Sequence, residues 1–141
     1  MISEISATAS ASIQASDDGH IMLGKLAVGG DLMVTVHDGG AVDAQGVTVT
    51  GGSTIAVTDD ARLTMAGSGT NVVLDARDDA VVELTGFQVT SAQVDAEDDA
   101  KVNLCATELL DVQVADASVR YSCQPKSLVQ NVTDGGKLAP I

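Results

Sequence analysis

The stretch from residue 55 to residue 65, Ile-Ala-Val-Thr-Asp-Asp-Ala-Arg-Leu-Thr-Met, decides the fold, because closely similar stretches recur along the chain. Residues 74–84 read Leu-Asp-Ala-Arg-Asp-Asp-Ala-Val-Val-Glu-Leu, and residues 94–104 read Val-Asp-Ala-Glu-Asp-Asp-Ala-Lys-Val-Asn-Leu. In each stretch apolar residues occupy every second position on both sides of an acidic pair. This period of two is that of a β-strand with one buried face. Each stretch therefore predicts a strand, a tight acidic turn and a second strand.

The acidic turn recurs seven times along the chain. Its leading aspartates are 21, 21, 19, 20, 18 and 18 residues apart, which gives a period near 20. A repeat of this length indicates a solenoid in which each copy forms one coil. A coil has room for a third short strand, which we place in Gly-bearing segments such as residues 24–30 and 46–52. The turns begin at Asp17, Asp38, Asp59, Asp78, Asp98, Asp116 and Asp134.

Residues at the same position of successive copies form columns, which parallel coils stack about 4.8 Å apart. Two apolar columns precede the turn and two follow it, and we expect all four to face the interior. Copy six is one residue shorter in its turn, and copy seven has Gln130 at an inward position. The columns are Ile13, Val34, Ile55, Leu74, Val94 and Val112; Ala15, Val36, Val57, Ala76, Ala96, Val114 and Val132; Ile21, Val42, Leu63, Val82, Val102, Val119 and Leu138; and Leu23, Ala44, Met65, Leu84, Leu104 and Tyr121.

These patterns predict one all-β domain over residues 1–141, a parallel β-helix (solenoid) of about seven coils. Ala, Val, Leu and Ile suit a narrow interior. The sequence has no Trp, and we expect its two aromatic residues, Phe87 and Tyr121, to be buried. The competing interpretation treats the copies as hairpins of an antiparallel barrel or sandwich. The regular period favours the solenoid.

The C-terminal third carries a second set of motifs. It contains Ala-Thr-Glu-Leu-Leu-Asp-Val at residues 106–112, Ala-Asp-Ala-Ser-Val-Arg-Tyr at 115–121, Pro125-Lys126, and Val-Thr-Asp-Gly-Gly at 132–136. This order resembles the ending of the GIN-domain family, also described as head domains of auto-transporter adhesins, although Cys123 stands where that family usually has Gly. The resemblance implies a right-handed parallel β-helix in a bacterial protein that is exported or anchored at the cell surface. It supplies no catalytic residue.

Charge and hydropathy exclude two classes of partner. Twenty acidic against seven basic side chains give a formal net charge of -13, so the phosphates of a nucleic acid would be repelled. No run of about eighteen apolar residues is present, so no membrane span is predicted. Residues 1–14 lack the basic start and apolar stretch of a secretory signal. The family resemblance implies an extracytoplasmic location, at the cell surface or in the periplasm, whereas the missing secretory signal leaves a cytoplasmic location open.

The acidic turns have two interpretations. An Asp side chain commonly caps its own turn by accepting a hydrogen bond from the backbone N–H two residues on. The alternative is a column of hard carboxylate ligands that gathers Ca²⁺ or a cationic partner. The turns match neither the EF-hand loop nor the Gly-rich nonapeptide repeat, so we predict no cofactor beyond weak Ca²⁺ binding. The candidate cation column is Asp17, Asp18, Asp38, Asp59, Asp60, Asp78, Asp79, Asp98 and Asp99.

Basic side chains stand beside these turns, each three residues after a leading aspartate. We expect them to face outward and to offset the local negative charge, with about 0–1 kcal/mol for each exposed pair. They are His20, Arg62, Lys101 and Lys137.

The sequence favours a non-enzymatic module with an adhesin-like binding or scaffolding role and a protein or surface glycan as partner. A catalytic site would gather acids and long loops on one coil, whereas these aspartates are evenly distributed. His20 and His37 have no Ser or Cys placed to complete a triad. The alternative is a carbohydrate-active or carbohydrate-binding β-helix with an acidic groove.

Two further expectations concern the cysteines and the ends. Cys105 and Cys123 lie one coil apart, which allows either a disulfide or two independent, partly buried thiols. A solenoid leaves unpaired strand edges at its first and last coils, and no capping helix is predicted at either end. We therefore expect irregular termini or a second copy of the chain to cover the ends, the latter giving a homo-oligomer through solenoid ends or faces.

Overall fold

The computed structural model describes residues 5–141, so residues 1–4 of the predicted domain lie outside it. Fourteen β-strands and no helix occur in this part of the chain, and hence no helix long and apolar enough to span a membrane. The strands are β1 (Ile5–Ala7), β2 (Ala11–Ala15), β3 (His20–Leu23), β4 (Leu26–Val28), β5 (Leu32–Val36), β6 (Ala41–Val49), β7 (Gly52–Val57), β8 (Arg62–Ser68), β9 (Asn71–Ala76), β10 (Val81–Glu97), β11 (Lys101–Ala115), β12 (Ser118–Tyr121), β13 (Ser127–Thr133) and β14 (Lys137–Pro140).

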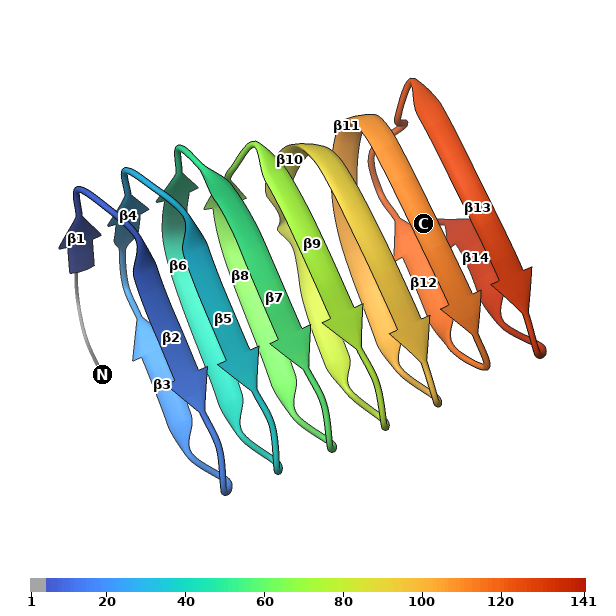
Figure 1. Cartoon of the computed structure of the whole chain (residues 1–141), viewed down its shortest axis with the longest axis horizontal. Helices are drawn as coiled ribbons and strands as arrows, with labels where there is room; N and C mark the ends of the chain where they lie inside the picture. The colour runs from blue at the N-terminus through green and yellow to red at the C-terminus, as the bar shows by residue number, and fades with distance from the viewer. Residues whose placement is uncertain (1–4) are drawn as a thin grey trace.

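The strands wind into stacked coils, as predicted, and the antiparallel barrel or sandwich is wrong. Every strand pairing is parallel, and each strand pairs with the equivalent segment of the neighbouring coil. In Figure 1 the strands entering the acidic turns run down the near side and the strands leaving them run up the far side. The coils advance from left to right, so the winding is right-handed.

Each coil contributes to three faces. The entry face is formed by the strands that lead into the acidic turns, and the exit face by the strands that follow them. A third, shorter face closes the coil. The entry face comprises β2, β5, β7, β9, residues 91–97 of β10, residues 109–115 of β11, and β13; the exit face comprises β3, the first halves of β6 and β8, the starts of β10 and β11, β12 and β14; the third face begins with β1 and β4.

The four predicted columns are the interior of the solenoid. Ile21, Val42 and Leu63 occupy one column, which continues through Val82 and Val102. In the middle coils these side chains are at most 3% exposed. The prediction is wrong about burial near the ends: Ile21, Tyr121 and Leu138 are only partly buried, and Val132 is 41% exposed. Burial fails there because a side chain in the first or last coil has a neighbouring coil on one side only.

Six of the seven acidic turns, all but the turn at Asp116, are closed by a main-chain hydrogen bond rather than by an aspartate side chain, which corrects the capping expectation. In the third copy the N–H of Ala61 donates to the carbonyl of Thr58 at 3.2 Å, and both central residues have positive φ, 57° at Asp59 and 61° at Asp60. These features define a type I′ turn. Aspartate tolerates the left-handed region better than most residues, which explains why an Asp pair can occupy both central positions.

One inward position on the entry face carries a polar side chain. Ser53 lies between Leu32 and Val72 in the adjacent coils and is 2% exposed, and among residues 5–141 its hydroxyl has no hydrogen-bond partner. A buried hydroxyl without a partner costs about 1–3 kcal/mol. We expect Ser53→Ala to raise the free energy of unfolding by about 1 kcal/mol or more, measured by urea denaturation.

The matched control for this variant is Ser12→Ala, because Ser12 is exposed on the same face. Its substitution should change stability by no more than about 0.5 kcal/mol. A loss of stability in Ser53→Ala would show that the hydroxyl is satisfied in solution.

Candidate functional site

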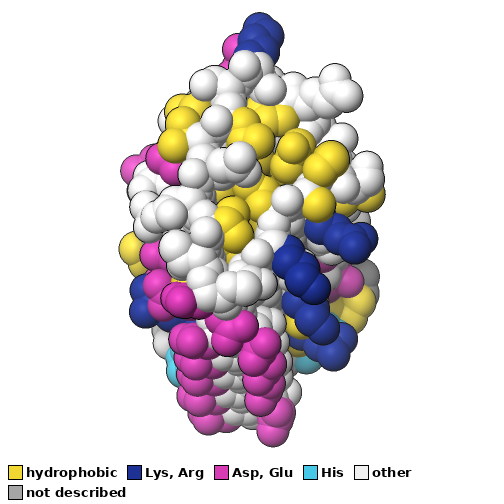
Figure 2. Space-filling view, turned by 90° about the vertical axis from the view of Figure 1, so that its right-hand side faces the viewer, with side chains coloured by type: hydrophobic (Ala, Val, Ile, Leu, Met, Phe, Trp, Pro, Cys, Tyr) yellow, Lys and Arg dark blue, Asp and Glu magenta, His cyan; other side chains and the backbone are white. Residues whose placement is uncertain are grey.

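The corner between the entry and exit faces carries two adjacent columns of aspartates, which we call the aspartate ladder. Figure 2 shows them as two rows of acidic side chains along one edge of the molecule. The first column contains all seven leading aspartates, and the second is interrupted by Gly39, Ala117 and Gly135. The first column is Asp17, Asp38, Asp59, Asp78, Asp98, Asp116 and Asp134, and the second is Asp18, Asp60, Asp79 and Asp99.

Backbone hydrogen bonds hold the ladder in register. The N–H of Asp60 donates to the carbonyl of Asp78 in the next coil at 3.0 Å, and the N–H of Asp79 donates to Asp98 at the same distance. At Gly39 an added Cβ would lie 2.3 Å from Oδ1 of Asp18, so the Asp18 carboxylate occupies the space over this glycine. The nine candidate residues chosen from the sequence thus all lie in one ladder, which also includes Asp116 and Asp134.

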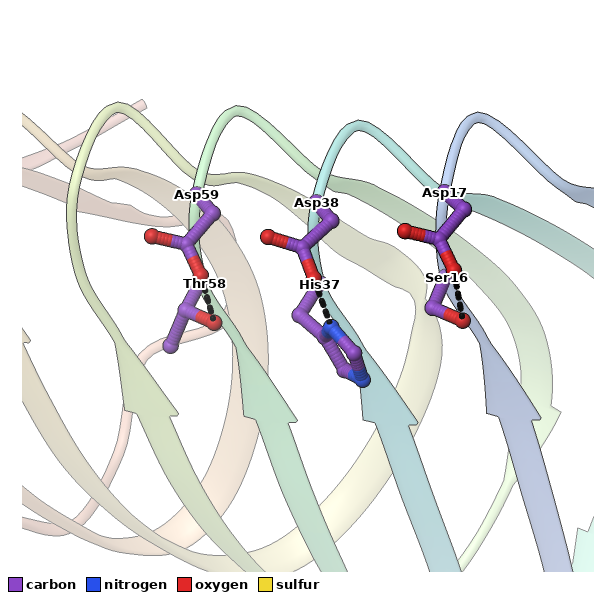
Figure 3. A network of polar contacts seen from close by, with 6 residues as sticks. All are labelled: Ser16, Asp17, His37, Asp38, Thr58 and Asp59. Carbon is purple, nitrogen blue, oxygen red and sulfur yellow. Dashed lines mark hydrogen bonds and ion pairs between the residues drawn. The ribbon is translucent and has the colours of Figure 1, made fainter.

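In the first three coils, each carboxylate of the first column contacts the side chain that precedes it (Figure 3). Oδ2 of Asp17 accepts from Ser16 at 3.4 Å, and Oδ2 of Asp59 accepts from Thr58 at 3.2 Å. In the second coil Nδ1 of His37 lies 2.7 Å from Oδ2 of Asp38. Within residues 5–141 no Lys or Arg side chain forms an ion pair with a ladder carboxylate, and the His37 contact becomes one only when the imidazole is protonated.

The predicted basic column exists on the exit face, beside the ladder but without direct contact to its carboxylates within residues 5–141. His20, Arg62 and Lys101 occupy equivalent positions in their coils, as does Lys137. In the part of the chain that the structure describes, none of these four forms an ion pair with a ladder carboxylate. The ladder therefore presents mostly uncompensated negative charge to solvent.

Two polar clusters lie outside the ladder. Nε of Arg77 lies 2.8 Å from Oδ1 of Asp75, and Nη1 of Arg77 lies 3.7 Å from Oε2 of Glu97. The hydrogen bond to Asp75 and the negative charges of Asp75 and Glu97 raise the pKa of Arg77. Burial acts to raise the pKa of Glu83, but hydrogen bonds from Thr85 and Asn103 outweigh it and lower that pKa overall. The stabilisation at Glu83 is therefore present at neutral pH and is lost as the pH falls.

No convergent metal site forms in the described residues. Within residues 5–141, no three His, Cys, Asp or Glu side chains gather around a common point. The ladder carboxylates lie side by side along the solenoid axis. Such an arrangement concentrates diffuse counterions and cationic groups without fixing a coordination geometry.

A shallow groove on the entry face was not anticipated from the sequence. It encloses about 500 Å³ and is lined by residues of β2, β5, β7 and β9. Met33 and Val73, which are 53% and 48% exposed, form its apolar part. The signal in the sequence was the presence of these apolar residues at outward positions of their strands.

Cys105 and Cys123 form a disulfide, which resolves the two alternatives left by the sequence. Their Cα atoms are 4.8 Å apart, and the bond joins adjacent coils across a sequence separation of 18. Cys105 is buried and Cys123 partly buried. The bridge ties β11 to the segment that follows β12, near the C-terminal end.

Neutralising part of the ladder should stabilise the fold at low salt. In the triple variant Asp60→Asn, Asp78→Asn and Asp79→Asn, each Asn tolerates positive φ while the repulsion between stacked carboxylates disappears. We expect the midpoint of thermal unfolding to rise at low ionic strength and to depend less on NaCl than in the wild type.

The control removes the same charge away from the ladder, with Asp43→Asn, Asp95→Asn and Asp111→Asn. It should change the salt dependence less than the ladder triple does. Identical salt dependence for the two triples would mean that the ladder carboxylates do not repel one another measurably.

Comparisons of the chain with protein-family models, with curated proteins and with solved structures find no match.

Proposed function

We propose that this protein is a non-enzymatic binding or scaffolding module of the cell surface or periplasm, in which the rigid aspartate ladder binds a positively charged partner. The observation that carries the proposal is the ladder itself. Its eleven carboxylates form two columns, are held in register by backbone hydrogen bonds, and within residues 5–141 make no ion pair with Lys or Arg. A rigid row of like charges offers many equivalent contacts to a repetitive cationic partner.

Two further features support this role. The Cys105–Cys123 disulfide is typical of an oxidising compartment such as the periplasm or the cell exterior. The polar side chains are also distributed evenly along the coils, whereas a catalytic site needs groups that converge on one substrate.

The partner class that fits is a lysine-rich protein segment or a surface glycan that carries free amino groups. Either presents closely spaced cations along an extended chain, and the ladder presents its carboxylates along the stacked coils at about 4.8 Å. Binding should be multivalent and strongly dependent on ionic strength.

The test measures binding of the whole chain to chitosan oligosaccharides and to polylysine, with N-acetylated chitin oligosaccharides as the uncharged control. We expect binding to the two cationic probes only, a fall in affinity with added salt, and no release of reducing sugar. The ladder triple should bind the cationic probes more weakly than the control triple described above. Equal losses in the two triples, or turnover of a glycan, would contradict the proposal.

A further inference from the structure

The last coil leaves an open, apolar end. Within residues 5–141, β13 pairs only with β11, and β14 pairs only with β12, so neither strand has a neighbour on its outer side. Figure 2 looks onto this end and shows apolar side chains gathered on it. Leu128 is 38% exposed, Val129 52% and Val132 41%. Leu128 and Val132 belong to inward columns, and the side chains they pair with, Leu110 and Val114, are buried. Val129 belongs to an outward column and pairs with Asp111.

The backbone of β13 offers a row of hydrogen-bonding groups that no other strand of residues 5–141 pairs with. The carbonyl of Thr133 accepts from Asp116 in the preceding coil. Because successive residues of a strand direct their polar groups to opposite sides, Leu128, Gln130 and Val132 direct theirs outward. The same direction is seen in the second coil, where Val36, the equivalent of Val132, accepts from Thr58 of the following coil at 3.0 Å.

This edge lacks the features that prevent strands from associating. Protected edges carry a charge, a proline or a bulge. The seven residues of β13, Ser-Leu-Val-Gln-Asn-Val-Thr, include no charged residue and no proline. Charged residues flank the strand on both sides, Lys126 before it and Asp134 after it.

We propose that β13 pairs antiparallel with β13 of a second copy, about a two-fold axis through Gln130, to give a closed dimer. In this register Leu128 lies opposite the partner's Val132, and both occupy inward columns. The outward-directed backbone groups of Leu128, Gln130 and Val132 then pair with the same groups of the partner. The entry faces of the two copies become one continuous sheet.

Charge complementarity selects this arrangement. The two-fold register places Lys126 opposite the partner's Asp134 at one end of the strand pair. At the other end Asp134 lies opposite the partner's Lys126. Lys126 lies 2.8 Å from Glu108 in its own chain, but that pair is exposed, so it opposes the new contact only weakly. Head-to-tail stacking on β2 would instead place Asp134 beside the next copy's Asp17 and lengthen a ladder of like charges. It would also give an open filament rather than a closed assembly.

The first test is the mass in solution. Light scattering of the wild-type chain should give twice 14.2 kDa at high concentration, with dissociation on dilution. Lys126→Glu places two acidic groups opposite each other at each end, and we expect about a tenfold weaker dimer. Lys101→Glu makes the same charge change on the exit face and should leave the dimer unchanged.

The second test reports the register. Opposite residues of a hydrogen-bonded antiparallel pair have Cα atoms about 5.5 Å apart, within the range that a disulfide accepts. Gln130→Cys should therefore give a covalent dimer on mild oxidation. Asn131→Cys is the matched control. In this register the two cysteines of that variant are diagonal neighbours rather than directly opposite, so they are farther apart and should cross-link much more slowly. A monomer at every concentration, or equal cross-linking of the two variants, would overturn the proposal.

Discussion

Replacing Phe87 with alanine is expected to lower the free energy of unfolding by about 3–5 kcal/mol, as for other large-to-small changes in a packed core. Phe87 is the single phenylalanine of the chain. It lies in β10 on the third face, is 1% exposed, and pairs with Gly67 of the preceding coil. Its ring is the largest fully buried side chain of the interior.

The cost should be near the upper part of this range, because the neighbouring coil cannot fill the cavity. An added Cβ at Gly69 would lie 2.8 Å from Cζ of Phe87, so the ring occupies the space over a residue without a side chain. Phe87→Leu retains most of the apolar volume and should cost about 1 kcal/mol.

Urea denaturation of the two variants against the wild type measures both effects, and an unchanged slope shows that only stability has changed. A Phe87→Ala variant within about 1 kcal/mol of the wild type would mean that the ring does not pack in the interior.

Removing the disulfide is expected to have the next largest effect. The double variant Cys105→Ala and Cys123→Ala opens a loop closed across 18 residues, and a bridge over a loop of this size contributes about 3 kcal/mol. The bridge joins coils next to the open C-terminal end, where fewer neighbouring residues hold the chain. We therefore expect the last coils to become the least stable part of the double variant.

The wild type under reducing conditions and the double variant serve as controls for each other. Reductant should lower the unfolding midpoint of the wild type to about that of the double variant, and should not change the variant itself. Hydrogen exchange at β12, β13 and β14 would locate the loss. If the variant unfolds at the wild-type midpoint without reductant, the bridge does not stabilise the fold.

The coil architecture could be predicted because two periodicities agree along the whole chain. Alternation at every second residue assigns side chains to the inside or outside of a strand, and the repeat near 20 residues aligns the strands of successive coils. Ile55, for example, was placed between Val34 and Leu74 from the sequence, and the structure pairs the same three residues. A one-residue slip would expose an entire column, so the register is strongly specified.

The ladder was predictable for the same reason, since its members occupy the same position in every copy. The way in which each acidic turn closes could not be predicted from the sequence. Aspartate is compatible both with a side-chain cap and with positive φ, and the choice depends on the backbone that neighbouring coils impose. The hydrogen bond from Asp60 to Asp78 is such a constraint, and it connects residues that are distant in sequence.

The sequence by itself determined which residues share a column, which columns face inward, and where the chain turns, because all three follow from short-range patterns repeated seven times. Only the tertiary structure decided how far each column is buried, that Cys105 and Cys123 are bridged, and that Ser53 lacks a hydrogen-bond partner in the described part of the chain. Those outcomes depend on what lies above and below a residue. Val132 has a neighbouring coil on only one side within the described chain. The same inward position that buries Val57 therefore leaves Val132 exposed.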